Sequence, residues 1–220
     1  MHIEVIHNSK SIASESFRTL RSNIQFSNFG QSIQTIVVTS SNPNEGKSEV
    51  SINLAASLAQ QGKKVLLIDA DMRKPTQHKI IGVMNTEGLS KFLLRETGAE
   101  AIQRLEILDV KFDVLTSGPV PPNPSEMLAS YAMEQSIKAF VEHYDYVIID
   151  TPPLLAATDA QVLARIADAT LLVVDPKQSK RRQIVEAKKR LDNVGARLLG
   201  TVMNKLKLTE GNNYYYYYKY

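Results

Sequence analysis

The chain has 220 residues, which suits one domain with a sizeable hydrophobic core. Hydrophobic residues make up 43% and charged residues 22%, and the net charge of +3 is too small to indicate nucleic-acid binding. The absence of cysteine excludes disulfides and cysteine-ligated metals. No apolar run approaches the roughly 18 residues that span a bilayer, and the N-terminus lacks a signal-peptide pattern, so we expect a cytoplasmic location.

Six short runs rich in Val, Ile and Leu predict buried strands. They are apolar on both alternating faces, as in strands covered on two sides, and occupy residues 33–39, 64–68, 112–115, 146–149, 170–174 and 198–202. Helical patterns fall between them at residues 48–61, 125–143, 159–166 and 178–194, the third with Thr158 as its cap. This alternation predicts an α/β fold with a doubly wound, mostly parallel sheet and helices on both faces.

A phosphate-binding loop is predicted between the first strand and the helix that follows it. The segment reads Ser41-Asn42-Pro43-Asn44-Glu45-Gly46-Lys47-Ser48. Backbone N–H groups at a helix start point at phosphate oxygens, Lys47 adds a positive charge, and the Ser48 hydroxyl ligates Mg²⁺. Ser41 and Asn44 stand where glycines are usual, although asparagine tolerates a positive φ. The loop predicts a P-loop NTPase-like fold, with Lys47 exposed.

Two further strands deliver carboxylates to the same edge of the sheet. Asp69 and Asp71 follow one buried strand, and Asp150 follows another. Acidic residues are common in solvated loops after strands. In an open α/β sheet, however, strand ends meet beside the phosphate loop, and three such signals in this order predict a site that moves the terminal phosphate of ATP.

The end of the chain is a tyrosine cluster. It lies behind Glu210-Gly211-Asn212-Asn213 and has neither helical nor strand periodicity, so we expect a solvated tail at residues 209–220 after a single domain of residues 1–208. One interpretation is that such a tail is simply an aromatic surface for association or for stacking on sugars. Beside a phosphate-transferring site, its hydroxyls are predicted phosphoacceptors: Tyr214, Tyr215, Tyr216, Tyr217, Tyr218 and Tyr220.

Together these motifs resemble the bacterial tyrosine kinases that control capsular and extracellular polysaccharide synthesis, in their separate cytoplasmic form. The resemblance covers nearly the whole chain and includes the phosphate loop, residues 69–75, 118–126 and 150–153, Asn204-Lys205 and the tyrosine cluster. Asn44 and Glu49 depart from it, because Gly and Thr are more usual there. It implies an ATP- and Mg²⁺-dependent protein-tyrosine autokinase that phosphorylates its tail in trans and regulates polysaccharide synthesis and export.

Residue roles follow from this resemblance. Because a phenol is a poor nucleophile at neutral pH, we assign Asp69 as its base, with Asp71, Asp150 and Ser48 holding Mg²⁺. Lys47 is catalytic, and Arg73 either neutralises developing charge or braces its loop. Asn204 is expected to contact the adenine edge. The full set expected to bind nucleotide is Ser41, Asn42, Pro43, Asn44, Glu45, Gly46, Lys47, Ser48, Glu49, Asn204 and Lys205.

Glu15, Arg18 and Arg21 are spaced three apart along one predicted helix. This is also the spacing of an ordinary surface Glu–Arg pair. In the resembled family an E-x-x-R-x-x-R helix joins subunits into a ring, such as an octamer. The resemblance further implies a membrane adaptor whose cytoplasmic tail activates the chain and recruits it to the inner face of the membrane, and a tyrosine phosphatase.

Two rival functions use the same features differently. A partitioning or positioning P-loop ATPase carries a lysine five residues before the loop lysine, where this chain has Asn42, and needs no tyrosine tail. A non-catalytic glycan-export scaffold would not need the intact set of lysine, serine and carboxylates.

A basic run near the end of the chain has two interpretations. It is either a solvated helix face or a surface that binds anionic lipid or an acidic partner. Its residues are Lys177, Lys180, Arg181, Arg182, Lys188, Lys189 and Arg190.

Overall fold

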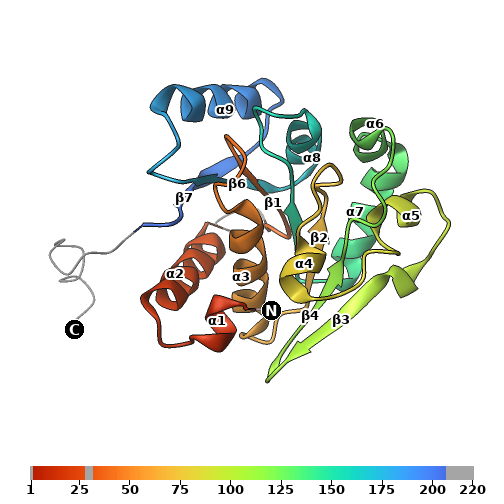
Figure 1. Ribbon diagram of the computed structural model, residues 1–220, viewed down its shortest axis with the longest axis horizontal. Coiled ribbons are helices and arrows are strands. Elements are labelled where there is room, and N and C mark those ends of the chain that lie inside the picture. Colours follow the sequence, from red (N-terminus) through yellow and green to blue (C-terminus); the bar gives the residue numbers. More distant parts are fainter. Residues whose placement is uncertain (1, 28–31, 207–220) are drawn as a thin grey trace, which may run out of the picture.

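The computed structural model describes residues 2–27 and 32–206; the predicted phosphoacceptors and the rest of residues 207–220 lie outside the described residues. Within them, seven strands form one sheet in the order β3-β4-β2-β5-β1-β6-β7 (Figure 1). Neighbouring strands are parallel except β3, which is antiparallel to β4. The strands are β1 Thr35–Ser40, β2 Val65–Asp69, β3 Ile102–Ile107, β4 Val110–Leu115, β5 Tyr146–Asp150, β6 Ala169–Val174 and β7 Leu198–Met203.

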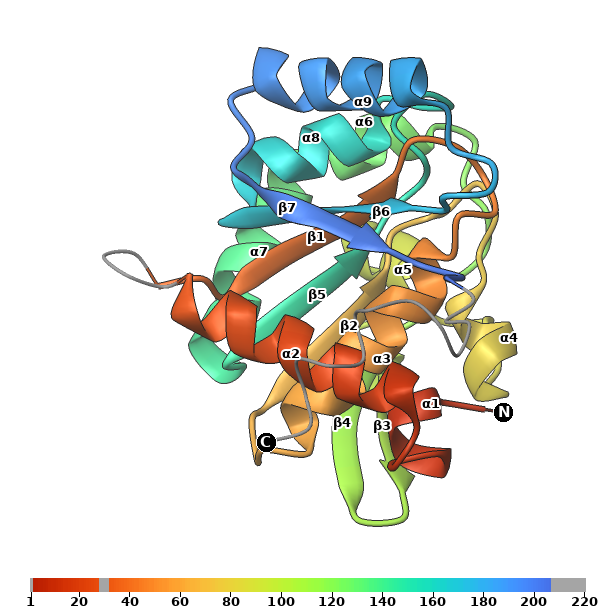
Figure 2. The ribbon, with the colours of Figure 1, turned by 90° about the vertical axis from the view of Figure 1, so that its left-hand side faces the viewer.

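Helices cover both faces of the sheet (Figure 2). One face carries α1 Glu4–His7, α2 Ile12–Phe26 and α3 Lys47–Ala59, with α4 Gln77–Ile81 at its rim. The other carries α5 Leu89–Leu93, α6 Pro124–Leu128, α7 Tyr131–His143, α8 Asp159–Ile166 and α9 Arg181–Asn193. None of the helices in the described part of the chain has the length and hydropathy needed to cross a membrane.

The core lies in two layers because each central strand is apolar on both sides. In β1, Ile36 and Val38 pack in the layer beneath α2 and α3, whereas Val37 packs in the opposite layer. All three side chains are fully buried. Apolar burial on both faces is what holds a parallel sheet between helices. The predicted doubly wound α/β fold is confirmed.

Several predicted elements needed correction. Strand β3 was not predicted, because its residues form no continuous apolar run: at the sheet edge, all of them except Ile107 are half-buried or exposed. The helix expected over residues 125–143 is two helices, since Ser130 is extended and its side chain caps α7 through Met133 N. Thr158 precedes α8 but makes no side-chain cap, and α9 begins only at Arg181, after Lys177 and Lys180.

Candidate active site

The phosphate loop turns from the end of β1 into α3 through two left-handed residues. Asn44 has φ 64° and Gly46 has φ 91°, so the tolerance of asparagine for this conformation, expected from the sequence, is used. At Gly46 a Cβ would lie 2.0 Å from Nδ2 of Asn204. Only glycine meets both the backbone conformation and this close approach.

Residues distant in sequence hold the loop in shape. Glu45 is fully buried and accepts hydrogen bonds from Ser41 Oγ at 3.0 Å, from Asn42 N at 2.9 Å and from Ser179 Oγ. Asn204 Nδ2 donates to Glu45 O at 3.3 Å, and Lys205 Nζ donates to Asn44 O at 2.5 Å. These side chains shape the loop, while the exposed Pro43 and Glu49 lie at its rim.

Lys47 lies inside the site, not on its surface. Its side chain is buried, with Nζ 2.8 Å from Asp71 Oδ2 and 3.7 Å from Asp150 Oδ1. Burial alone would lower the pKa of Lys47, but the carboxylates of Asp150 and Asp71 outweigh it and raise that pKa. The expectation of an exposed Lys47 was therefore wrong, because carboxylates at the ends of two strands attract the ammonium inward.

Asp69 and Asp150 are register partners at the ends of β2 and β5, and both are fully buried. Burial raises the pKa of Asp69 to about 7, and the neighbouring charge of Asp150 adds to the shift. Burial also raises the pKa of Asp150, against the lowering effect of Lys47. A carboxyl group that titrates near neutral pH has the property that a general base requires.

Two residues that sequence reasoning missed complete this centre. Thr76 Oγ1 donates to Ser48 Oγ at 2.9 Å, and the backbone N–H groups of Thr76 and Gln77 both donate to Asp69 Oδ2 at 3.0 Å. The Gln77 amide reaches Asp150 Oδ2 at 2.9 Å. The sequence signal was modest: both are polar residues that directly follow the acidic motif and its proline.

The structure favours one of the two roles left open for Arg73. Its Nε donates to Asp159 Oδ2 at 2.9 Å, and Nη2 donates to Ser125 Oγ at 2.8 Å. Asp159 is fully buried at the start of α8 and also accepts from Ser125 Oγ at 2.6 Å. A guanidinium so engaged braces the loop after β2 against α6 and α8.

The three predicted interface residues differ in exposure. Glu15 and Arg18 form an exposed ion pair, and Arg18 Nη2 donates to Ser9 O at 2.5 Å. Arg21 is buried, and its Nη1 donates to Ser57 O on α3 at 2.6 Å. Arg21 therefore packs α2 onto α3 of its own chain, whereas Glu15 is exposed and Arg18 is half-buried.

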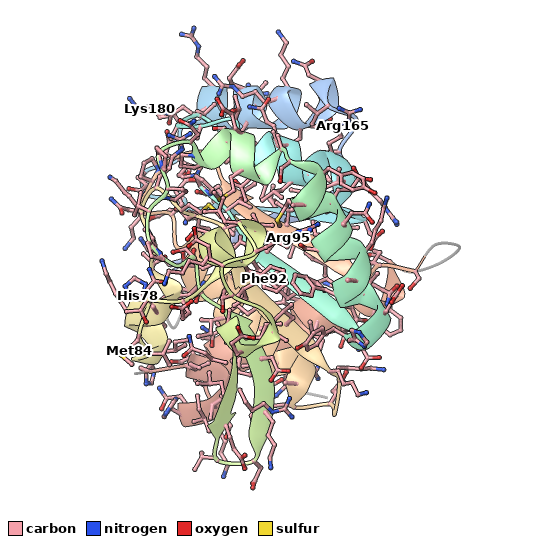
Figure 3. The ribbon with its side chains drawn as sticks, turned by 90° about the vertical axis from the view of Figure 1, so that its right-hand side faces the viewer. His78, Met84, Phe92, Arg95, Arg165 and Lys180 are labelled. Carbon is pink, nitrogen blue, oxygen red and sulfur yellow. The ribbon has the colours of Figure 1, made fainter. Side chains whose placement is uncertain are left out.

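The basic run is partly neutralised along α9. Lys188 pairs with Asp192, and Arg190 with Glu186, each one helical turn apart. Arg181, Arg182 and Lys189 are exposed, and Lys180 lies just before the helix (Figure 3). The interpretation as a solvated helix face accounts for these features.

The oxygen atoms around Lys47 suit a magnesium ion. No group of three His, Cys, Asp or Glu side chains that could hold a metal occurs in residues 2–27 and 32–206. Mg²⁺ needs no such group, since it is usually held by one or two carboxylates together with substrate phosphates and water. Asp150 Oδ1 is buried without a hydrogen-bond partner, and Ser48 Oγ and Asp71 lie around the same ammonium. The hard oxygen donors of these residues fit the ion.

A parallel sheet with a Gly-Lys-Ser loop and acidic strand ends defines a P-loop type of nucleotide-binding fold. Residues 33–206 match the family described as an AAA domain, AAA_31. Tyrosine-protein kinase YwqD of Bacillus subtilis (strain 168) is 45% identical over 209 residues, which cover 94% of this chain and 87% of YwqD.

Solved structures agree with this class. The chimerical protein CapA2B2 is 42% identical, with a TM-score of 0.89 over 94% of this chain and 90% of that one. The kinase domain of Escherichia coli tyrosine kinase ETK is 34% identical, with a TM-score of 0.91 over 97% of this chain and 84% of that one. The chain belongs to the bacterial tyrosine kinase family, and it is a protein-tyrosine kinase.

Proposed function

We propose that this kinase transfers the terminal phosphoryl group of ATP, with Mg²⁺, to the hydroxyls of its C-terminal tyrosine cluster. The target residues are Tyr214, Tyr215, Tyr216, Tyr217, Tyr218 and Tyr220. Residues 1–208 act as the kinase domain and residues 209–220 as the substrate tail. Phosphorylation of the tail regulates the synthesis and export of a capsular or extracellular polysaccharide.

One observation carries the proposal: the buried Lys47 is paired with Asp71 and lies close to Asp150, where the phosphate loop enters α3. The ammonium group of Lys47 can pair either with these carboxylates or with the phosphates of a bound nucleotide. Phosphate oxygens of ATP compete with Asp71 for the ammonium, and an Asp71 carboxylate released in this way is free to act in the site. Phosphoryl transfer depends mainly on such positioning and on charge neutralisation.

The same geometry supports the remaining roles, which are part of the proposal. Ser48, Asp71 and Asp150 would hold Mg²⁺, which when bound neutralises charge on the phosphates. Asp69 accepts the proton of the attacking tyrosine hydroxyl, because its pKa of about 7 lies near the operating pH. Asn204 and Lys205 support the loop from the end of β7. From there Asn204 contacts the adenine base.

The proposal extends to assembly and location. The tail of one copy enters the active site of a neighbour in a ring, an octamer being one such size, with the exposed Glu15–Arg18 pair of α2 at the contact. A membrane adaptor supplies an activating cytoplasmic tail and holds the kinase at the inner face of the membrane. A tyrosine phosphatase reverses the modification. Neither the partitioning ATPase nor the glycan-export scaffold accounts for the family membership together with the tyrosine cluster.

Mass spectrometry of the tail tests the proposal. The full chain is incubated with ATP and Mg²⁺, with and without an adaptor tail peptide, and the C-terminal peptide is analysed. We expect several phosphates per tail in the wild type and none in Lys47→Met or Asp150→Asn. An unmodified tail under all conditions, despite ATP turnover, would contradict the autokinase function.

A further inference from the structure

Gln77 occupies an unusual position for a polar residue. It opens α4, and its side chain is fully buried among the residues of the phosphate site. Its Nε2 donates to two acceptors from different elements. One is Ser48 O in the first turn of α3, at 3.0 Å, and the other is Asp150 Oδ2 at the end of β5, at 2.9 Å.

These contacts determine the orientation of the Gln77 amide. Both groups that face Nε2 are acceptors, so exchanging the amide nitrogen and oxygen would place oxygen against oxygen. The other end of the amide, Oε1, is buried without a hydrogen-bond partner. A buried polar atom without a partner is unfavourable. Gln77 therefore makes two donated hydrogen bonds in the site, while its Oε1 is left unsatisfied.

The bond that Gln77 donates to Asp150 also gives the two oxygens of that carboxylate different surroundings. Oδ2 accepts from Gln77, whereas Oδ1 has no hydrogen-bond partner and lies 3.7 Å from Lys47 Nζ. An amide NH₂ donates only, so it turns one oxygen of the carboxylate toward α4 and leaves the other toward the phosphate loop.

We propose that Gln77 is a positioning residue of the kinase: its amide ties the Asp150 carboxylate to the first turn of α3 and leaves Oδ1 facing Lys47, where Asp150 would help to hold Mg²⁺. The inference rests on the proposed function, in which Asp150 and Ser48 hold Mg²⁺. Gln77 is fully buried, and we assign it no direct part in phosphoryl transfer. Loss of a partner that orients a metal-holding carboxylate typically costs about 10- to 100-fold in metal affinity or activity.

The test separates nucleotide binding with and without magnesium. Binding of a fluorescent ADP analogue to the full chain is measured in EDTA and in Mg²⁺, together with kcat and KM for tail phosphorylation and the melting temperature. Gln77→Met removes both donated bonds at similar volume. We expect it to lower the magnesium-dependent gain in affinity by about tenfold, to lower kcat more than KM changes, and to leave affinity in EDTA unchanged.

A matched control and a second variant make the test decisive. Gln34 donates its amide to Val141 O at 3.3 Å near the start of β1, at the opposite end of the sheet, so Gln34→Met should leave the magnesium-dependent gain intact. Gln77→Asn keeps an amide but is too short to reach both acceptors, and should show a smaller loss in the same measurement. A wild-type magnesium dependence in both Gln77 variants would overturn the inference.

Two other outcomes are distinguishable. Equal losses of affinity in EDTA and in Mg²⁺, with a lower melting temperature, would assign Gln77 a merely structural role and overturn the inference while leaving the proposed function in place. Full tail phosphorylation by Asp150→Asn would contradict the proposed magnesium site, and the role of Gln77 would be rejected with it.

Discussion

The ammonium group of Lys47 lies 2.8 Å from the carboxylate of Asp71, so the cation expected to meet the triphosphate already has an acidic partner inside the site. Lys47→Met should abolish tail phosphorylation, because no other loop side chain supplies that charge. It should also lower the free energy of unfolding by about 3 kcal/mol, since it leaves buried carboxylates without their cation.

The check on Lys47 combines urea unfolding with mass spectrometry of the tail. Lys189→Met, which removes an exposed lysine from α9, is the control and should change stability by less than about 0.5 kcal/mol. Full phosphate incorporation by folded Lys47→Met would contradict the site assignment.

Asp69→Asn should slow phosphorylation more than it weakens nucleotide binding, because a base acts on the acceptor hydroxyl and not on ATP. We expect kcat to fall by about 10²-fold or more. The comparison uses the initial rate of tail phosphorylation and the affinity for ADP, both measured on the same preparation of wild type and of Asp69→Asn. A collapse of nucleotide affinity would instead make Asp69 chiefly a support for the magnesium site.

Stability in EDTA should depend on pH through Asp69. Its folded pKa of about 7 lies above the ordinary value of 3.8, so the folded state binds the proton more tightly than the unfolded state does. The contribution of Asp69 to the free energy of unfolding is therefore greatest at low pH, and it is lost as pH rises from about 4 to about 7. Melting temperatures across this range should show the slope in the wild type and a weaker slope in Asp69→Asn.

Gly46→Ala should damage the phosphate loop. The substitution places a Cβ on a residue with φ 91° and only 2.0 Å from Asn204 Nδ2, so the Asn204 side chain must move away. We expect a loss of about 1–2 kcal/mol in stability and a clear loss of nucleotide affinity. Gly200→Ala is the control, because a Cβ there meets nothing within 4 Å. Equal effects of the two variants would contradict this account.

Arg18→Ala and Arg21→Ala should have different effects. Arg18 is half-buried and pairs with the exposed Glu15, so its loss should reduce the mass of the oligomer in light scattering and lower the melting temperature less than the loss of Arg21 does. Arg21 is buried and donates to Ser57 O, so its loss should destabilise the subunit itself by about 1–3 kcal/mol. An unchanged oligomer mass in Arg18→Ala would exclude this side chain from the contact.

Tail phosphorylation should also loosen the ring. Each phosphate adds a charge of about −1.5 to −2 near neutral pH, which opposes docking beside Asp69, Asp71 and Asp150. Light scattering before and after treatment with a tyrosine phosphatase measures the change. Lys47→Met, with no phosphate on its tail, should keep one mass in both conditions. Identical masses of the wild type before and after treatment would contradict the switch.

The sequence by itself determined the central sheet and the place of the site. Short continuous apolar runs such as residues 146–149, alternating with helical patterns, indicate strands buried on two faces, and the carboxyl ends of parallel strands meet at one edge. The proximity of Asp69 and Asp150 to the phosphate loop followed from that geometry. These features depend on local periodicity and on the alternation of strands with helices, and both can be read from the sequence.

Only the tertiary structure decided which distant side chains meet. Arg73 and Asp159 are 86 residues apart and pair only because α8 packs beside the loop after β2. The burial of Lys47, the inward turn of Arg21 and the bridge made by Gln77 depend likewise on neighbouring elements. A polar residue has the same local pattern whether it is solvated or buried with partners. The difference lies in contacts that packing creates, and no short-range periodicity encodes them.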